Sequence, residues 1–396
     1  METSNSGWKE CKLGKVCSFQ EGYVNPPQGY PEYFDGNIKW LRATDLNNGY
    51  VYNTSRTLTE KGFRSAGKSA ILFKPNTIGI SKSGTIGRLG ILKDYMCGNR
   101  AVINIMPSGD VDTQFIYYAL FNRRNEFEQL AVGSVQKNLY VPILAELDIK
   151  LPPLNTQRRI AAVLSALDDK VELNNRINAN LEAQTQALFR SWFVDFEPWG
   201  GRMPDGWTEE NIYSVATIVY GVPFASKYFN EDKRGLPIVR IRDLKEQSTT
   251  TYTTEIHPLG CKIQAGDIVV GMDGEFRPYI WGTEAAWVNQ RVCLFKPKQT
   301  HYRAFVYQTI RPLLLEVERT EVATTVIHIG KRDFDAFRII LPTEDVLMEF
   351  GRICEPFYEK IVANMQQSHV LAALRDTLLP KLMSGEIDVS RVEVPA

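Results

Sequence analysis

Two stretches of the chain place apolar residues at alternating steps of four and three. The first stretch runs from Ile160 to Trp192 and the second from Phe350 to Leu382. A period of 3.5 residues is typical of helices that pack along a narrow seam. We therefore predict two long helices, and about 40 residues in each would extend roughly 60 Å at 1.5 Å per residue. The main seam positions are Leu164, Leu167, Val171, Asn174, Leu181 and Leu188 in the first stretch, and Ile361, Asn364, Leu371 and Leu378 in the second.

An asparagine interrupts each seam at the same midpoint, Asn174 in the first and Asn364 in the second. A buried polar residue at a seam fixes register at some cost in stability. Because the two stretches have equal length and matched interruptions, we predict that the helices run antiparallel and bring the two asparagines together. Proline is tolerated at a helix start and stops a helix later, so Pro152 and Pro198 bracket the first helix. The alternative is that each helix only packs inside one globular core.

The rest of the chain has a different pattern. Short β-like runs alternate with Gly, Pro, Asn and Asp in residues 1–150 and again in about 204–340. One helical stretch interrupts each region, at residues 113–130 and 302–318. We therefore predict an α+β protein in the order globular domain (1–150), helix (151–203), globular domain (204–340) and helix (341–396).

The chain also repeats itself. Residues 99–102 align with 289–292, and residues 149–152 with 339–342, both at an offset of 190. Further upstream, residues 40–46 align with 238–244 at an offset of 198. A unit of about 190 residues used twice predicts a molecule with internal pseudo-twofold symmetry rather than a solenoid.

Composition limits the class of protein. The 396 residues carry 46 basic and 46 acidic side chains, and 44% are hydrophobic, which excludes a chain disordered throughout. No run approaches the roughly 18 apolar residues of a membrane span, and the polar start favours the cytoplasm. The scattered cysteines are expected to be reduced thiols. Zero net charge argues against a nonspecific nucleic-acid coat but not against sequence-specific DNA binding.

Charge by segment is more informative than the total. Residues 1–150 carry 18 basic and 14 acidic groups, whereas residues 341–396 carry 5 and 9. Residues 201–340 are nearly balanced, with 18 and 17. The first globular domain is therefore mildly basic, and the C-terminal helical region is acidic.

Several blocks of sequence resemble the specificity subunit of type I restriction–modification enzymes. They include Leu-Pro-Pro-Leu at residues 151–154 and Phe-Val-Asp-Phe at 193–196, both of which are specific signals. The blocks at residues 83–87, 133–139 and 378–387 also look like that family. The resemblance covers essentially the whole chain in the order domain, helix, domain, helix.

The resemblance implies a function and a set of partners. Each globular domain would be a target-recognition domain that reads one half of a split, asymmetric target in double-stranded DNA. The antiparallel helices would set the spacer between the halves and dock two modification subunits, which methylate adenine; restriction subunits would add translocation and cleavage. This chain would hold no cofactor, while S-adenosylmethionine, ATP and Mg would bind the partner subunits.

Candidate DNA-binding residues lie on matching segments of the two copies. Phosphate contact needs Lys or Arg, whereas base reading needs hydrogen-bonding side chains in a groove. In the first domain the candidates are Arg42, Lys82, Ser83, Thr85, Arg88, Gln136 and Lys137; in the second they are Arg240, Arg242, Asp273, Glu275, Arg277 and Tyr279. The acidic pair Asp273 and Glu275 would suit cytosine N4. Arg242 and Asp243 could equally form a structural ion pair.

Motifs for an enzyme fail on their context. Residues 62–69 satisfy the P-loop pattern, but a polar turn precedes them and a strand-like run follows, the reverse of what phosphate binding needs. The four histidines do not have metal-ligand spacing. We predict no catalytic residue and no metal site. The main alternative to a DNA-specificity module is a duplicated coiled-coil scaffold that binds proteins only, and a nuclease or methyltransferase comes a distant third.

Overall fold

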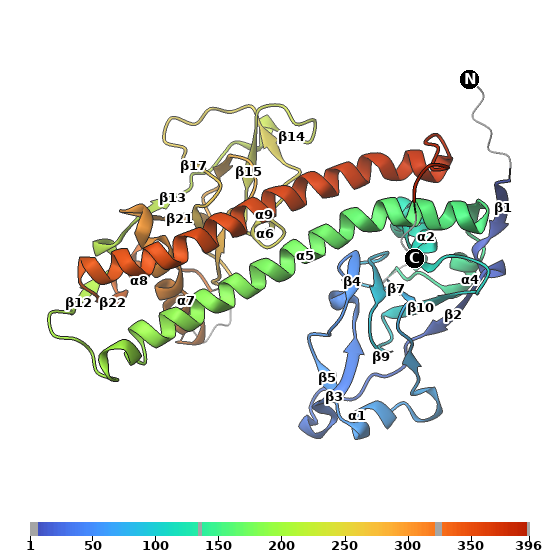
Figure 1. Cartoon of the computed structure of the whole chain (residues 1–396), viewed down its shortest axis with the longest axis horizontal. Coiled ribbons are helices and arrows are strands. Elements are labelled where there is room, and N and C mark those ends of the chain that lie inside the picture. Colours follow the sequence, from blue (N-terminus) through green and yellow to red (C-terminus); the bar gives the residue numbers. More distant parts are fainter. Residues whose placement is uncertain (1–6, 134–136, 321–326, 394–396) are drawn as a thin grey trace. The chain divides into compact units, whose positions relative to one another are not determined.

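The computed structural model describes residues 7–133, 137–320 and 327–393. Its contacts divide the chain into two compact units, Met1–Glu172 with Leu371–Ala396 (the first unit) and Leu173–Val370 (the second unit). Each unit holds one globular domain and part of each of the two longest helices, α5 (Leu154–Phe193) and α9 (Glu344–Ser384), drawn in green and in orange to red in Figure 1. The compact units therefore cut across the four consecutive segments expected from the sequence.

The described residues of the first unit form three sheets. A small antiparallel pair joins β1 (Lys9–Lys12) to β11 (Asp148–Leu151). The largest sheet has the order β2-β10-β7-β8-β4 and the third has the order β5-β3-β9-β6. Their strands are β2 (Cys17–Glu21), β3 (Phe34–Leu41), β4 (Gly49–Val51), β5 (Thr57–Leu58), β6 (Leu72–Phe73), β7 (Ile78–Ser81), β8 (Leu89–Leu92), β9 (Met96–Gly98) and β10 (Val102–Pro107).

The second unit has a similar arrangement, but the sheet that corresponds to the first unit's five-stranded sheet has four strands, and the other has five instead of four. Its small pair joins β12 (Thr208–Asn211) to β22 (Arg338–Leu341), and its other sheets have the orders β13-β21-β18-β19 and β14-β16-β15-β20-β17. Their strands are β13 (Ala216–Tyr220), β14 (Phe229–Asn230), β15 (Leu236–Val239), β16 (Tyr252–Thr253), β17 (Lys262–Ile263), β18 (Ile268–Gly271), β19 (Pro278–Ile280), β20 (Ala286–Val288) and β21 (Val292–Pro297).

One parallel strand pair shows how closely the copies match. β3 pairs β9 in parallel with Trp40 opposite Cys97, and β15 pairs β20 in parallel with Ile238 opposite Trp287. These partners are related by the same offsets, 198 and 190, that align the two copies in the sequence. The predicted α+β fold and internal duplication are confirmed, down to strand register.

The helices inside the globular domains differ in continuity between the copies. In the first unit, α2 (Thr113–Asn122) ends before α3 (Phe127–Leu130) begins, so the single helix predicted over 113–130 is interrupted near Arg123. In the second unit α7 (Arg303–Thr320) is continuous although Pro312 lies inside it. Short helices complete the domains: α1 (Glu60–Arg64), α4 (Val141–Ala145), α6 (Ile241–Leu244) and α8 (Lys331–Asp335).

Local chemistry explains where α5 begins and ends. The Pro153 carbonyl accepts the backbone N–H groups of Thr156 and Gln157, which would otherwise be unpaired in the first turn. The buried Gln157 side chain donates to the Pro152 carbonyl and accepts from the backbone of Asp112, and so ties the start of α5 to that of α2. At the other end Phe196 adopts a left-handed conformation with φ +52°, which stops the helix.

The two asparagines predicted at the helix seam lie together in the second unit and are almost completely buried. The Asn174 amide lies 3.3 Å from the Asn364 carbonyl and 2.9 Å from the Gln367 side-chain oxygen. The Asn364 amide donates to the side chain of Asn178 at 2.8 Å. Residue numbers rise along α5 as they fall along α9, so the segments run antiparallel there.

The seam positions away from the asparagines pack against the globular domains. Leu164 is fully buried in the core of the first unit, together with Leu379 and Leu382 of α9. In the second unit Ile361 is buried in the core, and Leu181 and Leu188 pack against it. Burial of each such side chain contributes about 1.5–3 kcal/mol, so the helices are structural parts of each unit. Leu167, Val171, Leu371 and Leu378 are half-buried.

Candidate nucleic-acid interface

Three segments of the first unit converge beside β7 and β8. The loop at residues 82–88 joins these two strands, and the Lys82 carbonyl accepts the N–H of Leu139 at 2.9 Å. The Lys82 N–H donates to the carbonyl of Ala101 at 2.7 Å. The structure thus brings the loop at 82–88 next to the segment that begins at Lys137, and it adds the turn before β10, which contains Arg100. Gln136 lies outside the described residues.

The cations at this junction fall into two groups. Lys82 is committed to the protein, because its amino group lies 2.6 Å from the Glu21 carboxylate and 5.6 Å from the centre of the Tyr140 ring. The hydrogen bond from Lys82 holds the pKa of Glu21 below its usual range. Exposed Arg88, Arg100 and Lys137, by contrast, have no hydrogen bond or ion pair from their side chains to any described residue.

The polar candidates beside these cations are accessible. Thr85 is exposed and Ser83 is half-buried. Gly84 has φ +77°, and a Cβ built there would meet no atom of the described residues within 4 Å. At Gly87, with φ +82°, an added Cβ would lie 2.8 Å from the Phe127 side chain, so this position has no room for a side chain. The glycines therefore have different roles, and only Gly84 leaves the backbone open to a ligand.

The second unit builds the same junction with the same backbone bonds. The loop after β18 places Met272 at the position of Lys82, and its carbonyl accepts the N–H of Ile329 at 3.0 Å. The Met272 N–H donates to the Arg291 carbonyl at 2.8 Å. The loop and the segment at 327–329 therefore lie side by side, as their counterparts do in the first unit.

The side chains at this second junction are mostly paired with one another. Asp273 lies 2.6 Å from Nδ1 of His328 and 3.5 Å from the guanidinium of Arg291. The guanidinium of Arg277 forms an ion pair with Glu318. Glu275 is exposed, and burial raises the pKa of the half-buried Tyr279. This face therefore presents polar groups held in place by the protein.

The remaining arginine candidates are placed differently from one another. Arg42 donates its backbone N–H to Asp45 at 2.8 Å, and Arg240 does the same to Asp243 at 3.0 Å, so each begins a short helical turn. Both guanidinium groups also bind these carboxylates. The suggested pair of Arg242 with Asp243 is wrong, because the carboxylate folds back three residues to Arg240 and leaves Arg242 exposed.

Sequence reasoning missed Arg100, Arg291 and His328 as parts of these surfaces. Arg100 precedes a strand by two residues, and its aligned position, Gln290, is neutral. His328 has no metal-ligand spacing and no other pattern that marks it in its own segment. The alignment of the two copies could have indicated Arg291 and His328. At the offset of 190 they align with residues 101 and 138, which lie beside the loops already chosen as candidates.

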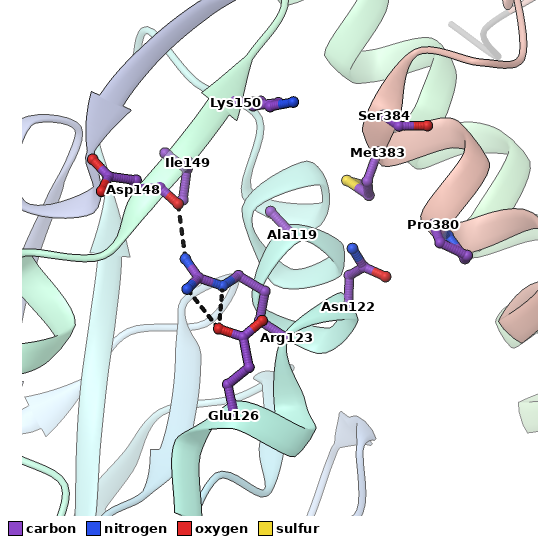
Figure 2. Close-up of a pocket in the computed structure, with 10 residues that line it drawn as sticks. All are labelled: Ala119, Asn122, Arg123, Glu126, Asp148, Ile149, Lys150, Pro380, Met383 and Ser384. Atoms are coloured by element: carbon purple, nitrogen blue, oxygen red, sulfur yellow. Dashed lines mark hydrogen bonds and ion pairs between the residues drawn. The ribbon is translucent and has the colours of Figure 1, made fainter. Parts of the chain in front are cut away.

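A pocket in the first unit has a volume of about 470 Å³. Figure 2 shows Arg123, from the end of α2, donating to Glu126 and to the Asp148 carbonyl, so its guanidinium is committed to the fold. Lys150 extends from β11 on the side where Met383 and Ser384 of α9 lie. Among the described residues, the lining includes neither histidine nor cysteine.

Metal clusters and membrane spans are absent from the described part of the chain. No group of three His, Cys, Asp or Glu residues there is placed to hold a metal ion. No helix within 7–133, 137–320 or 327–393 is long and apolar enough to cross a membrane. The P-loop-like segment lies partly inside α1, where the Gly62 N–H is used by the Thr59 hydroxyl that caps this helix. Its glycine is therefore unavailable to a phosphate.

Known proteins are similar to this chain in sequence and in fold. Residues 5–183 and 204–368 match the model of the type I restriction modification DNA specificity domain. The MjaIX specificity subunit of Methanocaldococcus jannaschii is 29% identical over 94% of this chain and 91% of its own length. The HindI specificity subunit of Haemophilus influenzae is 22% identical over 96% of this chain and 100% of its own.

A solved structure has a similar fold. The crystal structure of a type I restriction-modification system S subunit from M. genitalium aligns with a TM-score of 0.52 at 17% sequence identity, covering 96% of this chain and 98% of that one. The family model matches both copies of the repeat, and together the matched residues make up most of the sequence. This chain belongs to the family of type I restriction–modification DNA specificity subunits.

Proposed function

We propose that this chain reads a bipartite, asymmetric DNA target, with one recognition domain on each half, and that it docks two methyltransferase subunits on its helices. The chain itself carries no chemistry in this scheme. S-adenosylmethionine, ATP and Mg belong to the partner subunits, and restriction subunits join the same complex. Double-stranded DNA is the ligand of the chain, and methylated adenine is the product of its partners.

The observation that carries this proposal is the repeated loop junction. Two independent domains form the same pair of backbone hydrogen bonds, at Lys82 and at Met272, yet surround them with different side chains. A scaffold that bound one kind of protein partner twice would be expected to keep similar side chains there. Two different sets on one backbone frame suit the reading of two different half-targets.

Acidic helices with exposed apolar residues favour protein partners rather than DNA. Residues 341–396 carry 9 acidic and 5 basic groups. In the second unit Leu173 and Val370 are 47% and 65% exposed, although both lie within long helices. Exposed apolar surface on a helix is expected to be covered in a complex. A methyltransferase subunit is the partner that family membership favours.

The direct test is reconstitution with the modification subunits of the same source, followed by mapping of methylated adenines on plasmid DNA. We expect a motif of two short specified halves around an unspecified spacer. The protein-only scaffold predicts that the modification subunits either act without this chain or show the same motif when it is omitted. Either result would exclude the proposed role in recognition.

The helices offer a second test, of spacer length. Inserting seven residues into both α5 and α9 keeps the 3.5-residue period and adds about 10 Å, which corresponds to roughly three base pairs. We expect the spacer to lengthen while both half-targets stay unchanged. A single four-residue insertion in one helix is the control, because it breaks the seam and should reduce assembly.

A further inference from the structure

Three side chains from separate segments meet at the tip of the second unit's loop junction. Asp273 follows β18, Arg291 precedes β21, and His328 lies beyond α7. The Asp273 carboxylate contacts the imidazole through one oxygen, at 2.6 Å, and the arginine through the other, at 3.5 Å. The Arg291 guanidinium also approaches the His328 ring, at 3.3 Å. We call these three residues the triad.

The triad is not required to build the junction. At the matching positions the first copy has Ser83, Ala101 and Asn138, in place of Asp273, Arg291 and His328 respectively. The backbone bonds on either side are nevertheless the same in both units. The residues at all three positions differ between the copies, whereas the backbone hydrogen bonds of the junction are the same. The triad is therefore not needed for folding of the junction.

The geometry orients one edge of the histidine outward. In the Nδ1–H tautomer, the ring donates to the Asp273 carboxylate 2.6 Å away and carries its lone pair on Nε2. Within the described residues Nε2 has no hydrogen-bond partner, and the side chain is 47% exposed. An oriented acceptor of this kind fits an exocyclic amino group, N6 of adenine or N4 of cytosine, at the floor of the major groove.

We propose that His328 reads one base of the second half-target by accepting a hydrogen bond through Nε2 from an adenine or cytosine amino group. Asp273 and Arg291 are positioning residues that fix the ring. This inference rests on the proposed function and deepens it, since it names the element and the chemical group that it recognises. In the first domain the corresponding contact would come from Ser83 and Asn138.

The test uses the complete complex with its modification subunits, acting on plasmids in which the second half-target is randomised. His328→Ala should relax the preference at one position of that half, where a good base contact discriminates roughly 5- to 150-fold. The preference in the first half-target should be unchanged. The triple variant Asp273→Ser, Arg291→Ala, His328→Asn, which installs the first copy's residues, should alter the preferred base at the same position.

Positioning is tested separately from structure. Asp273→Asn keeps an oxygen that accepts from Nδ1 and should retain the wild-type preference, whereas Asp273→Ala should lose it. The matched control is Arg234→Ala, which breaks an exposed arginine–aspartate pair of the same domain and should change neither half. Assembly of each variant complex is checked by its methylation of plasmid DNA that carries the complete native target, with both half-targets unchanged.

The outcomes separate the inference from the proposed function. If the native complex shows a bipartite motif and His328→Ala leaves every position of the second half unchanged, the triad does not read a base. If His328→Ala changes both halves, the residue acts on the fold and the inference also fails. If the native complex shows no bipartite motif, the proposed function fails first.

Discussion

In both units, polar side chains at matching positions join the long helices to the globular domain. The first unit uses charged side chains there, and the second uses neutral ones. In the first unit, Tyr118 of α2 donates to Asp168 of α5 at 2.7 Å, and Arg375 of α9 lies 2.6 Å from the same carboxylate. In the second unit, the corresponding Gln308 donates to Tyr358 at 3.2 Å. One junction holds an ion pair whose two side chains are each 13% exposed, and the other is neutral.

The third position completes the contrast. Arg375 aligns with Thr185, a buried residue whose hydroxyl donates to the Leu181 carbonyl of its own helix. Each set satisfies its own donors and acceptors, which is what a buried polar network requires. The comparison teaches that the duplicated frame accepts either chemistry as long as the set is complete, and that the first junction depends on charges that can be removed one at a time.

The largest effect is expected at the ionic junction. Arg375→Ala leaves the largely buried Asp168 without its cation, and the loss of stability should be about 3 kcal/mol at neutral pH. Denaturant unfolding of the full chain measures it. Thr185→Ala, the matched change in the second unit, should cost no more than about 1 kcal/mol. Equal costs for the two variants would remove the distinction between the junctions.

The ionic junction should also make that loss depend on pH. Burial raises the pKa of Asp168, and Arg375 opposes this shift, so Arg375→Ala raises the pKa further. An acid whose pKa is higher in the folded state than in the unfolded state destabilises the fold as pH rises through that interval. The cost of Arg375→Ala should therefore shrink as pH falls towards 4; a cost that grew in acid would contradict the assignment.

The next effect concerns the recognition faces. Replacing Arg88, Arg100 and Lys137 together by glutamine should weaken DNA binding by roughly tenfold and reduce the slope of log affinity against log salt by about one for each phosphate left without a cation. In the second unit, Arg277 and Arg291 are already engaged in ion pairs. Replacing them by glutamine should change the salt slope less. Binding of the assembled complex, measured between about 50 and 200 mM salt, distinguishes the faces.

The smallest effect comes from a carboxyl that only the second unit buries near its helix. Glu182 has no hydrogen bond or ion pair to the described residues, and burial raises its pKa, with Arg311 acting against that shift. The first copy has Ala372 at this position. Glu182→Gln, which resembles the protonated acid, should stabilise the chain by about 1 kcal/mol at pH 7.

The direction with pH follows from the raised pKa. The native chain is more stable when Glu182 is protonated, because the charged carboxylate is buried. This stability is lost as pH rises above 4.5 through the folded-state pKa of Glu182. The advantage of Glu182→Gln should therefore be greater at pH 7 than at pH 4. Unfolding curves at pH 4 and pH 7 measure it, and an advantage that is greater at pH 4 would show that the carboxyl is stabilising when charged.

The sequence was sufficient for the features that depend on periodicity and repetition. The seam spacing predicted both long helices, and the matched asparagines predicted where α5 and α9 meet, because a 3.5-residue period fixes which side chains share a face. The alignment offsets also predicted equivalent strands, as the register of β3 with β9 and of β15 with β20 confirms.

The partners of individual charged residues could not be predicted in the same way. Lys82 aligns with Met272, which is uncharged, and its partner Glu21 is 61 positions away on another strand. His328 and Asp273 are 55 positions apart and meet only because two loops share backbone hydrogen bonds. Such pairs depend on tertiary distance, which the pattern of a single segment does not contain.

The central claim is that each copy of the repeat reads its own half of one DNA target. The most direct measurement exchanges residues 204–340 for the equivalent domain of another specificity subunit and maps methylated adenines made by the reconstituted complex. We predict a hybrid motif, in which one half and the spacer stay native and the other half follows the donor. A motif that changes in both halves, or in neither, would contradict the claim.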